Sequence, residues 1–181
     1  MPAPLQVRWL QRFDERAITH LSEVLIDCVE GGASVSFMLP MPHAKAEAYW
    51  RSIAVKAAHE EVRVFVAEES DIIIGTAQLL LEVPENQPHR GAIAKMLVHR
   101  RWRGRGAGAA LLAAAENAAL ALGKTLLVLD TASPEAERLY RRGGWQLCGI
   151  IPDYALYPDG RLCDTKVFFK QLGPAASGGS G

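Results

Sequence analysis

A short stretch rich in glycine and arginine lies between a predicted strand and a predicted long helix, and it limits the possible folds more than any other feature. The stretch consists of Arg103, Gly104, Arg105, Gly106, Ala107 and Gly108. Glycines let the backbone approach a ligand closely and turn several N–H groups toward one point. The helix that follows adds the positive end of its dipole. The stretch therefore predicts a pyrophosphate site made mainly of backbone donors, with Arg100 and Arg101 adding positive charge.

Other interpretations of this stretch are weaker. A P-loop requires a Gly-Lys-Ser/Thr sequence, which the stretch lacks. A dinucleotide-binding unit requires an acidic residue at the end of the next strand, and no acidic residue lies at the right distance here. Its first strand would also begin only at Ala92, so that about 90 residues would precede the unit. A glycine-rich turn with solvated arginines stays open as the purely structural alternative.

The charge is balanced over the whole chain but unevenly distributed along it. The 181 residues carry 20 Lys and Arg against 20 Asp and Glu, which argues against nucleic acid as a partner. Residues 1–90 have a net charge of −5 and residues 91–181 a net charge of +5. We therefore expect an anionic ligand at the second half, and the acidic first half suits a cationic one.

The cysteines and histidines do not form a recognisable framework. Three widely spaced cysteines and five scattered histidines predict neither disulfides nor a metal site, and they favour a cytoplasmic location. No apolar run approaches the ~20 residues that a membrane span needs, and no leader pattern is evident, so no membrane contact is expected.

Hydrophobic spacing predicts one α/β domain over residues 1–172, followed by a flexible tail or cloning remnant at 173–181. Two helices come first, from Asp14 to Gly31 and from His43 to about His59. In the middle of the chain, valines recur at every second position, as apolar residues do in β-strands. The expected strands cover residues 7–10, 62–66, 72–83, 92–98, 125–129, 146–151 and 163–169.

Two further helices interrupt the later strands. A helix is expected from Gly106 to Leu122, with a buried face formed by Leu111, Ala115, Ala118 and Leu122. Another is expected to begin after Ser133, which can cap it, and to end near Arg142. The strand before it, residues 125–129, is apolar throughout and predicts burial on both faces.

These features of the sequence resemble those of the GCN5-related N-acetyltransferase (GNAT) superfamily. Arg103-x-x-Gly106-x-Gly108 matches the superfamily's Arg/Gln-x-x-Gly-x-Gly/Ala signature between a strand and a helix. A second block, in which a helix ending Leu-Tyr precedes Gly-Phe, corresponds to Leu139-Tyr140 and Gly144-Trp145. This chain has Ser133 where the superfamily usually has Asn. The resemblance implies a central, mixed, mostly antiparallel β-sheet flanked by helices.

The resemblance also implies a cosubstrate and roles for particular residues. Acetyl-CoA would bind with its phosphates on the glycine-rich stretch, near Ser133, and its pantetheine arm beside a strand. That strand contains Met96, Leu97 and Val98, and an N–H near Leu97 would stabilise the oxyanion. Tyr140 corresponds to the tyrosine that protonates the leaving thiolate, although a core aromatic residue is the alternative.

The general base is less directly implied. Many members of the superfamily have a glutamate where this chain has Ala92. Asp130 is the remaining candidate because it follows a buried strand, at the end where α/β sheets present functional groups. Capping of a turn or helix is its structural alternative, and a chain of water molecules could replace any base.

A narrower resemblance is to the tabtoxin-resistance acetyltransferases, carried by residues 31–38, 129–131 and 158–162. It implies a small-molecule amine acceptor, such as a toxin or an antibiotic-like compound, and a role in resistance. The superfamily resemblance also makes a homodimer plausible. Two alternatives stay open, namely a non-catalytic acyl-CoA sensor on the same fold and a protein or peptide N-acetyltransferase.

Overall fold

The computed structural model describes residues 4–173, so the expected tail at 173–181 lies, apart from Gly173, outside the described residues. The helices are α1 (Glu15–Glu30), α2 (His43–Ala58), the short 3₁₀ helix η1 (Arg100–Trp102), α3 (Ala107–Ala121) and α4 (Pro134–Arg142). The strands are β1 (Gln6–Trp9), β2 (Val62–Glu69), β3 (Ile72–Leu80), β4 (Arg90–Val98), β5 (Leu126–Thr131), β6 (Gln146–Leu156) and β7 (Leu162–Gln171).

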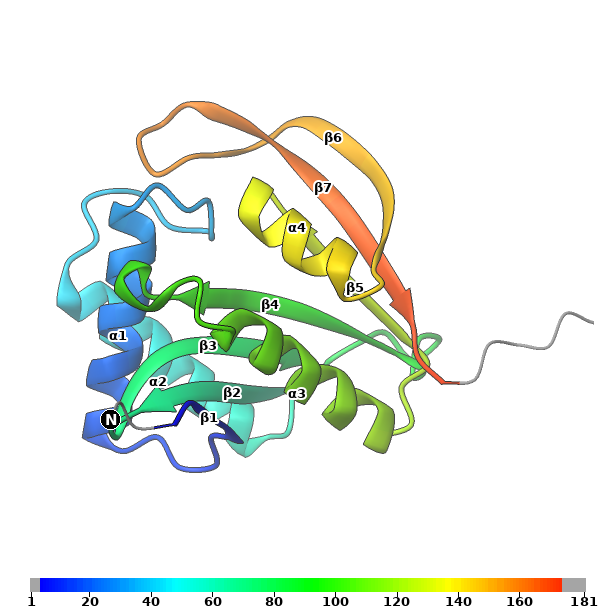
Figure 1. Ribbon diagram of the computed structural model, residues 1–181, viewed down its shortest axis with the longest axis horizontal. Coiled ribbons are helices and arrows are strands. Elements are labelled where there is room, and N and C mark those ends of the chain that lie inside the picture. The colour runs from blue at the N-terminus through cyan, green and yellow to red at the C-terminus, as the bar shows by residue number, and fades with distance from the viewer. Residues whose placement is uncertain (1–3, 174–181) are drawn as a thin grey trace, which may run out of the picture.

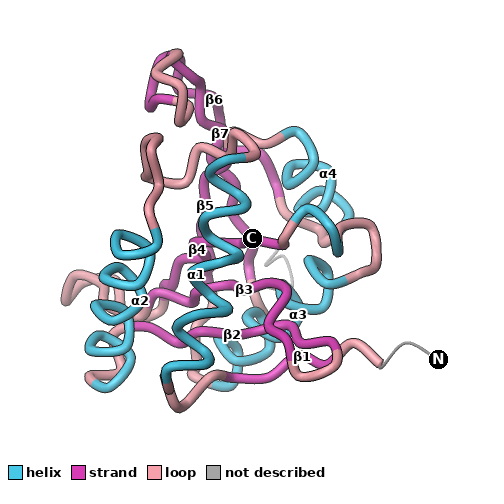
Figure 2. The backbone as a smooth tube through the Cα atoms, turned by 90° about the vertical axis from the view of Figure 1, so that its left-hand side faces the viewer, coloured by secondary structure: helices cyan, strands magenta, loops and turns pink. Residues whose placement is uncertain are grey.

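The seven strands form one sheet in the order β1-β2-β3-β4-β5-β7-β6 (Figure 1). Every neighbouring pair is antiparallel except β4 and β5, which run parallel, so the expected mixed, mostly antiparallel sheet is confirmed. Helices α1 and α2 lie on one face and α3 and α4 on the other (Figure 2). Because side chains alternate along a strand, Val64 packs on the α1 side and Phe65 on the α3 side.

The two parallel strands separate soon after they meet. They are paired only where Arg90–Ala92 lies beside Leu126–Val128, whereas β4 continues to Val98 and β5 to Thr131 (Figure 1). Beyond Ala92, β4 therefore has a backbone edge that β5 does not cover. The sheet is split at its middle, which provides space for a ligand between two of its own strands.

Three sequence expectations need correction. Leu111 and Ala115 are buried as predicted, but Ala118 is only partly buried and Leu122 is 38% exposed, because α3 ends at Ala121 and its buried face continues to Ala119. Strand β5 is not buried on both faces, since only its alternate residues Leu127 and Leu129 are buried. Strand β6 is five residues longer than expected, because the chain pairs with β7 again beyond an irregularity around residues 151–155.

None of the helices between residues 4 and 173 combines the length and the apolar character that crossing a membrane requires.

Candidate functional site

A cavity of about 770 Å³ lies in the split between β4 and β5. Its wall includes the loop after α1, the end of β4, the glycine-rich stretch, the end of β5 and α4. Nearly all residues singled out from the sequence line it, namely Met96, Leu97, Val98, Arg103, Gly104, Gly106, Ala107, Gly108, Asp130, Ser133 and Tyr140. The fold therefore brings the two sequence blocks to one place.

The glycine-rich stretch has the backbone conformation that its composition predicts. Gly104 and Gly106 have φ angles of 76° and 88°, a region that favours glycine. Gly106 is the residue before α3, and no side chain of residues 4–173 caps that helix end. The first N–H groups of α3 have no partner within the helix, so they are available to an anion in the cavity. A Cβ on Gly108 would lie 3.2 Å from Leu139, so glycine also permits close packing of α3 on α4.

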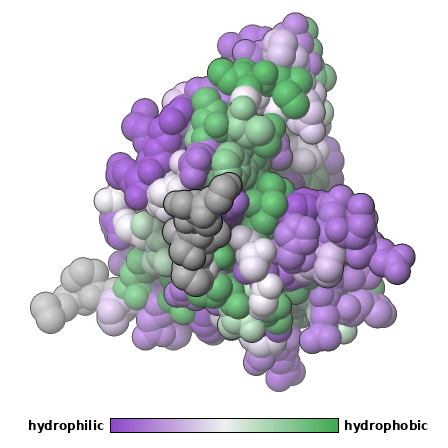
Figure 3. Space-filling model, turned by 90° about the vertical axis from the view of Figure 1, so that its right-hand side faces the viewer, coloured by the Kyte–Doolittle hydropathy of each residue, from purple (hydrophilic) through white to green (hydrophobic). Residues whose placement is uncertain are grey.

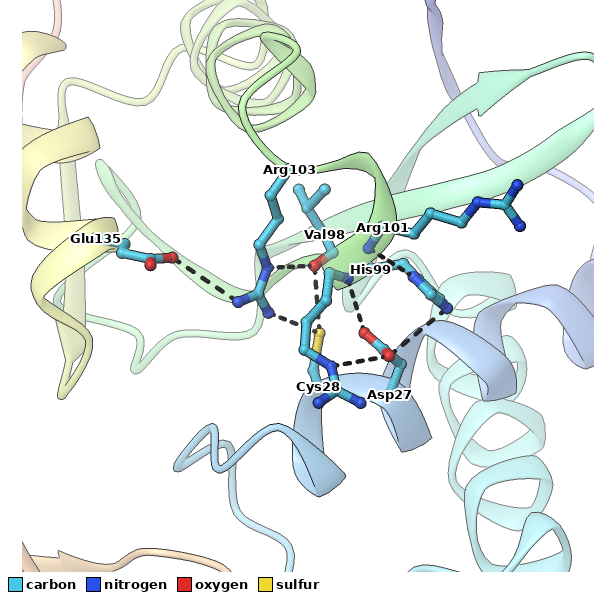
Figure 4. Close-up of polar contacts among 8 residues, drawn as sticks. Asp27, Cys28, Val98, His99, Arg101, Arg103 and Glu135 are labelled. Carbon is cyan, nitrogen blue, oxygen red and sulfur yellow. Dashed lines mark hydrogen bonds and ion pairs between the residues drawn. The ribbon is translucent and has the colours of Figure 1, made fainter.

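The side chain of Arg103 lies along the cavity wall and points toward Val98, Cys28 and Glu135 (Figure 4). Its Nε donates to the Val98 carbonyl at 2.9 Å, and its Nη2 lies 3.7 Å from the Cys28 sulfur. On the other side, Nη1 is 3.8 Å from a carboxylate oxygen of Glu135 at the start of α4. Arg103 therefore connects α1, β4 and α4 around the proposed phosphate site.

The other arginines in and before the glycine-rich stretch point away from the cavity or pair with acidic residues. Arg100 forms an ion pair with Asp27 at 3.0 Å, and Arg101 extends away from this cluster (Figure 4). Arg105 does not line the cavity, and its guanidinium is 3.5 Å from Glu69. The Arg105 side chain is turned toward the β2–β3 hairpin, and its contact with the cofactor stays a prediction.

Two arginines that the sequence analysis missed line the cavity instead. Arg138 and Arg142 belong to α4 and lie four residues apart, which places them on one face of that helix. Both guanidiniums can pair with phosphate groups. In the sequence, the i, i+4 spacing of these two arginines on either side of Tyr140 was the signal that could have identified them as site residues.

The edge of β4 presents some backbone groups to the cavity and directs others into the sheet. Leu97 pairs with Thr76 of β3, and the amide of His99 donates to Ile74. In an antiparallel ladder, residues that bond to the neighbouring strand alternate with residues that do not. Leu97 therefore bonds to β3, and the backbone groups of Val98 point away from β3, toward the split. The pairing shifts register between Ala94 and Leu97, so the alternation is interrupted at Met96. This alternation favours Val98 over Leu97 as the donor to an oxyanion.

Tyr140 is held rigidly by aromatic neighbours. Its ring is 4% exposed and lies 5.9 Å from that of Trp145 and 6.0 Å from that of Phe168. Trp145 is fixed in turn by a 2.7 Å bond from its indole N–H to Glu116. Among the hydrogen bonds between residues 4 and 173, none involves the Tyr140 hydroxyl, although the residue lines the cavity. The phenol is therefore free to donate to a ligand.

We expect Tyr140 to keep its proton at pH values at which an ordinary tyrosine has lost it. Burial raises the pKa of Tyr140, and the negative charge of Asp130 raises it further. The tyrosinate absorbance of the wild type, minus that of Tyr140→Phe, should therefore stay flat up to about pH 10, the ordinary tyrosine pKa. A difference signal that develops at lower pH would show that the phenol is not in this environment.

Asp130 is the only carboxylate among the proposed catalytic residues. The alternative that it caps a turn or helix α4 is wrong. Ser133 caps α4 by accepting from the Ala136 amide at 3.2 Å, and Thr131 accepts from the Ser133 amide. Within the described residues, the Asp130 carboxylate bonds instead to the Thr165 hydroxyl at 3.1 Å. Ala92 lies where β4 and β5 are still paired, and it offers no acid.

A second cavity of about 330 Å³ continues from this point on the side of α1 and β6. The two cavities share residues at the ends of β5 and of the α1–α2 loop, namely Ser34, Ser36, Asp130, Thr131 and Ala132. The second cavity adds Asp164, whose carboxylate accepts from the Asp153 amide at 3.0 Å, and apolar residues such as Phe37 and Leu156. Asp130 therefore lies where two ligands, one in each cavity, would meet.

Comparison with known proteins agrees with this geometry. A family model described as "Acetyltransferase (GNAT) family" matches residues 18–145. Among solved structures, a ribosomal-protein-alanine N-acetyltransferase from Brucella melitensis is 22% identical, with a TM-score of 0.75 over 92% of this chain and 99% of that one. A GCN5-related N-acetyltransferase from Kribbella flavida is 20% identical, with a TM-score of 0.77 over 93% and 98%.

A third similar structure was solved with acetyl-CoA. It is a GNAT superfamily phosphinothricin acetyltransferase from Sinorhizobium meliloti, 21% identical, with a TM-score of 0.75 over 96% of this chain and 91% of that one. At these identities the likeness shows a shared fold. The family match over most of the chain carries the assignment.

Proposed function

The chain belongs to the acetyltransferase (GNAT) family, whose enzymes use acetyl-CoA as cosubstrate, and on that premise we propose that it acetylates the primary amine of a small molecule by direct attack. The observation that carries this proposal is the split between β4 and β5. Among residues 4–173, it gathers helix N–H groups that no side chain caps, arginines, a tyrosine hydroxyl without a hydrogen-bond partner and a carboxylate around one cavity. These groups fit a pyrophosphate at one end and acyl transfer at the other.

In the proposed reaction both substrates are bound at once. The ammonium of the acceptor gives a proton to Asp130, and the neutral amine attacks the thioester carbonyl. The backbone N–H of Val98 stabilises the oxyanion. When the C–S bond breaks, the Tyr140 hydroxyl protonates the leaving sulfur. The extra proton of the amide nitrogen then returns to the Tyr140 oxygen, and Asp130 releases its proton to water. Holding the two substrates side by side supplies much of the rate.

The size and charge of the second cavity support a small amine as acceptor. Its volume of about 330 Å³ lies in the range of small-molecule sites. Asp130 places a carboxylate at its wall, which suits a cationic amine. The Sinorhizobium relative is described as acting on a small molecule, phosphinothricin, whereas the Brucella relative is described as acting on a ribosomal protein. A toxin or antibiotic-like acceptor and a role in resistance are part of the proposal.

An acceptor panel tests this choice of substrate class. Release of the CoA thiol should depend on added amine, and small primary amines should give higher kcat/KM values than peptides with N-terminal alanine. A higher kcat/KM for the peptides would replace the proposal with protein N-acetylation.

Replacing Asp130 with asparagine should lower kcat about 10-fold, less than a general base usually contributes, because water can also take the proton. The asparagine can still accept from Thr165, so the fold should be kept, and the Kd of acetyl-CoA should not change. Asp164→Asn is the matched control, since Asp164 also lines the second cavity but its carboxylate accepts from the Asp153 amide. Equal losses of kcat in both variants would show general attraction of the amine and no proton transfer at Asp130.

The homodimer is also part of the proposal. Strand β6 is an outer strand of the sheet, and it exposes Ile150, Ile151 and Leu156 by 43–53%. Hydrophobic surface is visible on the upper part of the molecule, which β6 and β7 form (Figure 3). An exposed apolar edge strand is suited to pairing with another chain. A cytoplasmic location stays a prediction from the sequence.

A further inference from the structure

Lys95 is a cavity residue that the proposed reaction does not use. It lies at an irregularity in the pairing of β3 with β4, with a φ angle of 48°. Its ammonium donates to the hydroxyl of Ser36 at 3.2 Å, and Ser36 also has a left-handed backbone, with a φ angle of 76°. Non-glycine residues in this conformation are strained and concentrate at functional sites. The backbone therefore adopts two unfavourable conformations where these side chains meet.

The ammonium of Lys95 is poorly compensated. It has three donors, and within residues 4–173 its hydrogen bond to Ser36 is accompanied by no ion pair closer than 4.0 Å. The rings of Phe37 and Tyr49 lie about 6 Å away, which gives only weak cation–π attraction. Burial lowers the pKa of Lys95, opposed by the negative charge of Asp130. A partly buried cation without an anionic partner is costly, and a ligand can supply that partner.

The position of Lys95 indicates which ligand this is. Ser36, to which Lys95 donates, lines both cavities, so the ammonium lies beside the junction where the acceptor must enter. Asp130 lines the same junction and acts on Lys95 through its charge. A site that presents one cation and one anion to the same ligand is complementary to a zwitterion.

We infer that Lys95 binds a carboxylate of the acceptor, so that the substrate class is an amine that also carries an acid group, as an amino acid does. The inference rests on the proposed function and refines it. The acceptor ammonium lies toward Asp130 and its carboxylate toward Lys95. A second role for Lys95, as a general base, predicts a different result, because it would lower kcat for every amine.

Kinetics with matched pairs of acceptors separate these roles. The pairs are phenylalanine with phenethylamine, methionine with 3-(methylthio)propylamine, and lysine with cadaverine. The wild type should prefer the acid-bearing member about 10- to 100-fold in kcat/KM, the value of a charge-assisted hydrogen bond. Lys95→Met should remove that preference through KM, and Lys95→Arg should keep most of it. Equal kcat/KM values within the wild-type pairs would overturn the inference, as would a uniform loss of kcat in Lys95→Met.

Labelling gives an answer that does not depend on turnover. Lysines are modified with an acetyl N-hydroxysuccinimide ester and quantified by peptide mass spectrometry, with the exposed Lys45 as internal reference. Millimolar amino acids should slow the modification of Lys95, relative to Lys45, at least several-fold more than their decarboxylated partners do. Equal or absent protection overturns the inference. Absence of turnover with every amine, with selective protection retained, would instead refute the proposed function alone.

Discussion

Replacing Tyr140 with phenylalanine should reduce kcat by about 10²- to 10⁴-fold, the range measured for general acids. The substitution removes one oxygen atom and leaves the ring packed against Trp145 and Phe168. The hydroxyl has no bond to any described residue that its loss would break. The fold and the Kd of acetyl-CoA should therefore be unchanged, and the loss should appear in the chemical step. The value of kcat is measured from stopped reactions, and the Kd of acetyl-CoA is measured by calorimetry.

A matched control is available for this variant. Tyr157 lines the same cavity, but its ring lies under the guanidinium of Arg161, 5.4 Å from it, in the turn between β6 and β7. Tyr157→Phe should keep kcat within a few-fold of the wild type. If Tyr140→Phe behaves like this control, Tyr140 is a packing residue and the leaving thiolate is protonated by another group.

Replacing Gly106 with alanine should weaken acetyl-CoA binding about 5- to 30-fold. An L-residue in the left-handed region costs about 1–2 kcal/mol, and relaxation of that strain turns the loop amides. Gly106 has a φ angle of 88° and immediately precedes the first amides of α3. A Cβ there meets nothing within 4 Å, so the effect comes from the backbone and not from a clash.

Gly123 provides the control, because it has a φ angle of 75° just beyond the other end of α3 and also has open space around its Cα. Both alanine variants should lose similar unfolding free energy in denaturant titrations. Only Gly106→Ala should lose acetyl-CoA affinity in calorimetry. Equal affinities in the two variants would remove the glycine-rich stretch from the phosphate site.

Local signals predicted much of the fold and most of the residues that line the first cavity. The periodicity of Ile18, Leu21 and Leu25 predicted α1, and all three residues are buried. Ser133 was recognised as a helix cap, and it caps α4. Gly106 was assigned to a ligand-binding turn from its place before a helix. These features depend on residues close to one another in the sequence, so local sequence patterns are enough to predict them.

The features that were missed depend on contacts between distant segments. Arg105 pairs with Glu69, and the sequence does not show that the β2–β3 hairpin passes beside the glycine-rich stretch. Lys95 donates a hydrogen bond to Ser36 at an irregularity in β4, and no local sequence pattern predicts that irregularity. Arg138 and Arg142 were visible as a pair, but their cavity exists only because β4 and β5 separate.

The most direct test of direct transfer within the split cavity is the initial rate of CoA release, measured with acetyl-CoA varied at several fixed concentrations of an accepted amine. Attack in a ternary complex predicts double-reciprocal lines that intersect, with no acetylated enzyme in mass spectra. Parallel lines accompanied by an acetylated enzyme, or saturable acetyl-CoA binding without amine-dependent CoA release, would contradict the account.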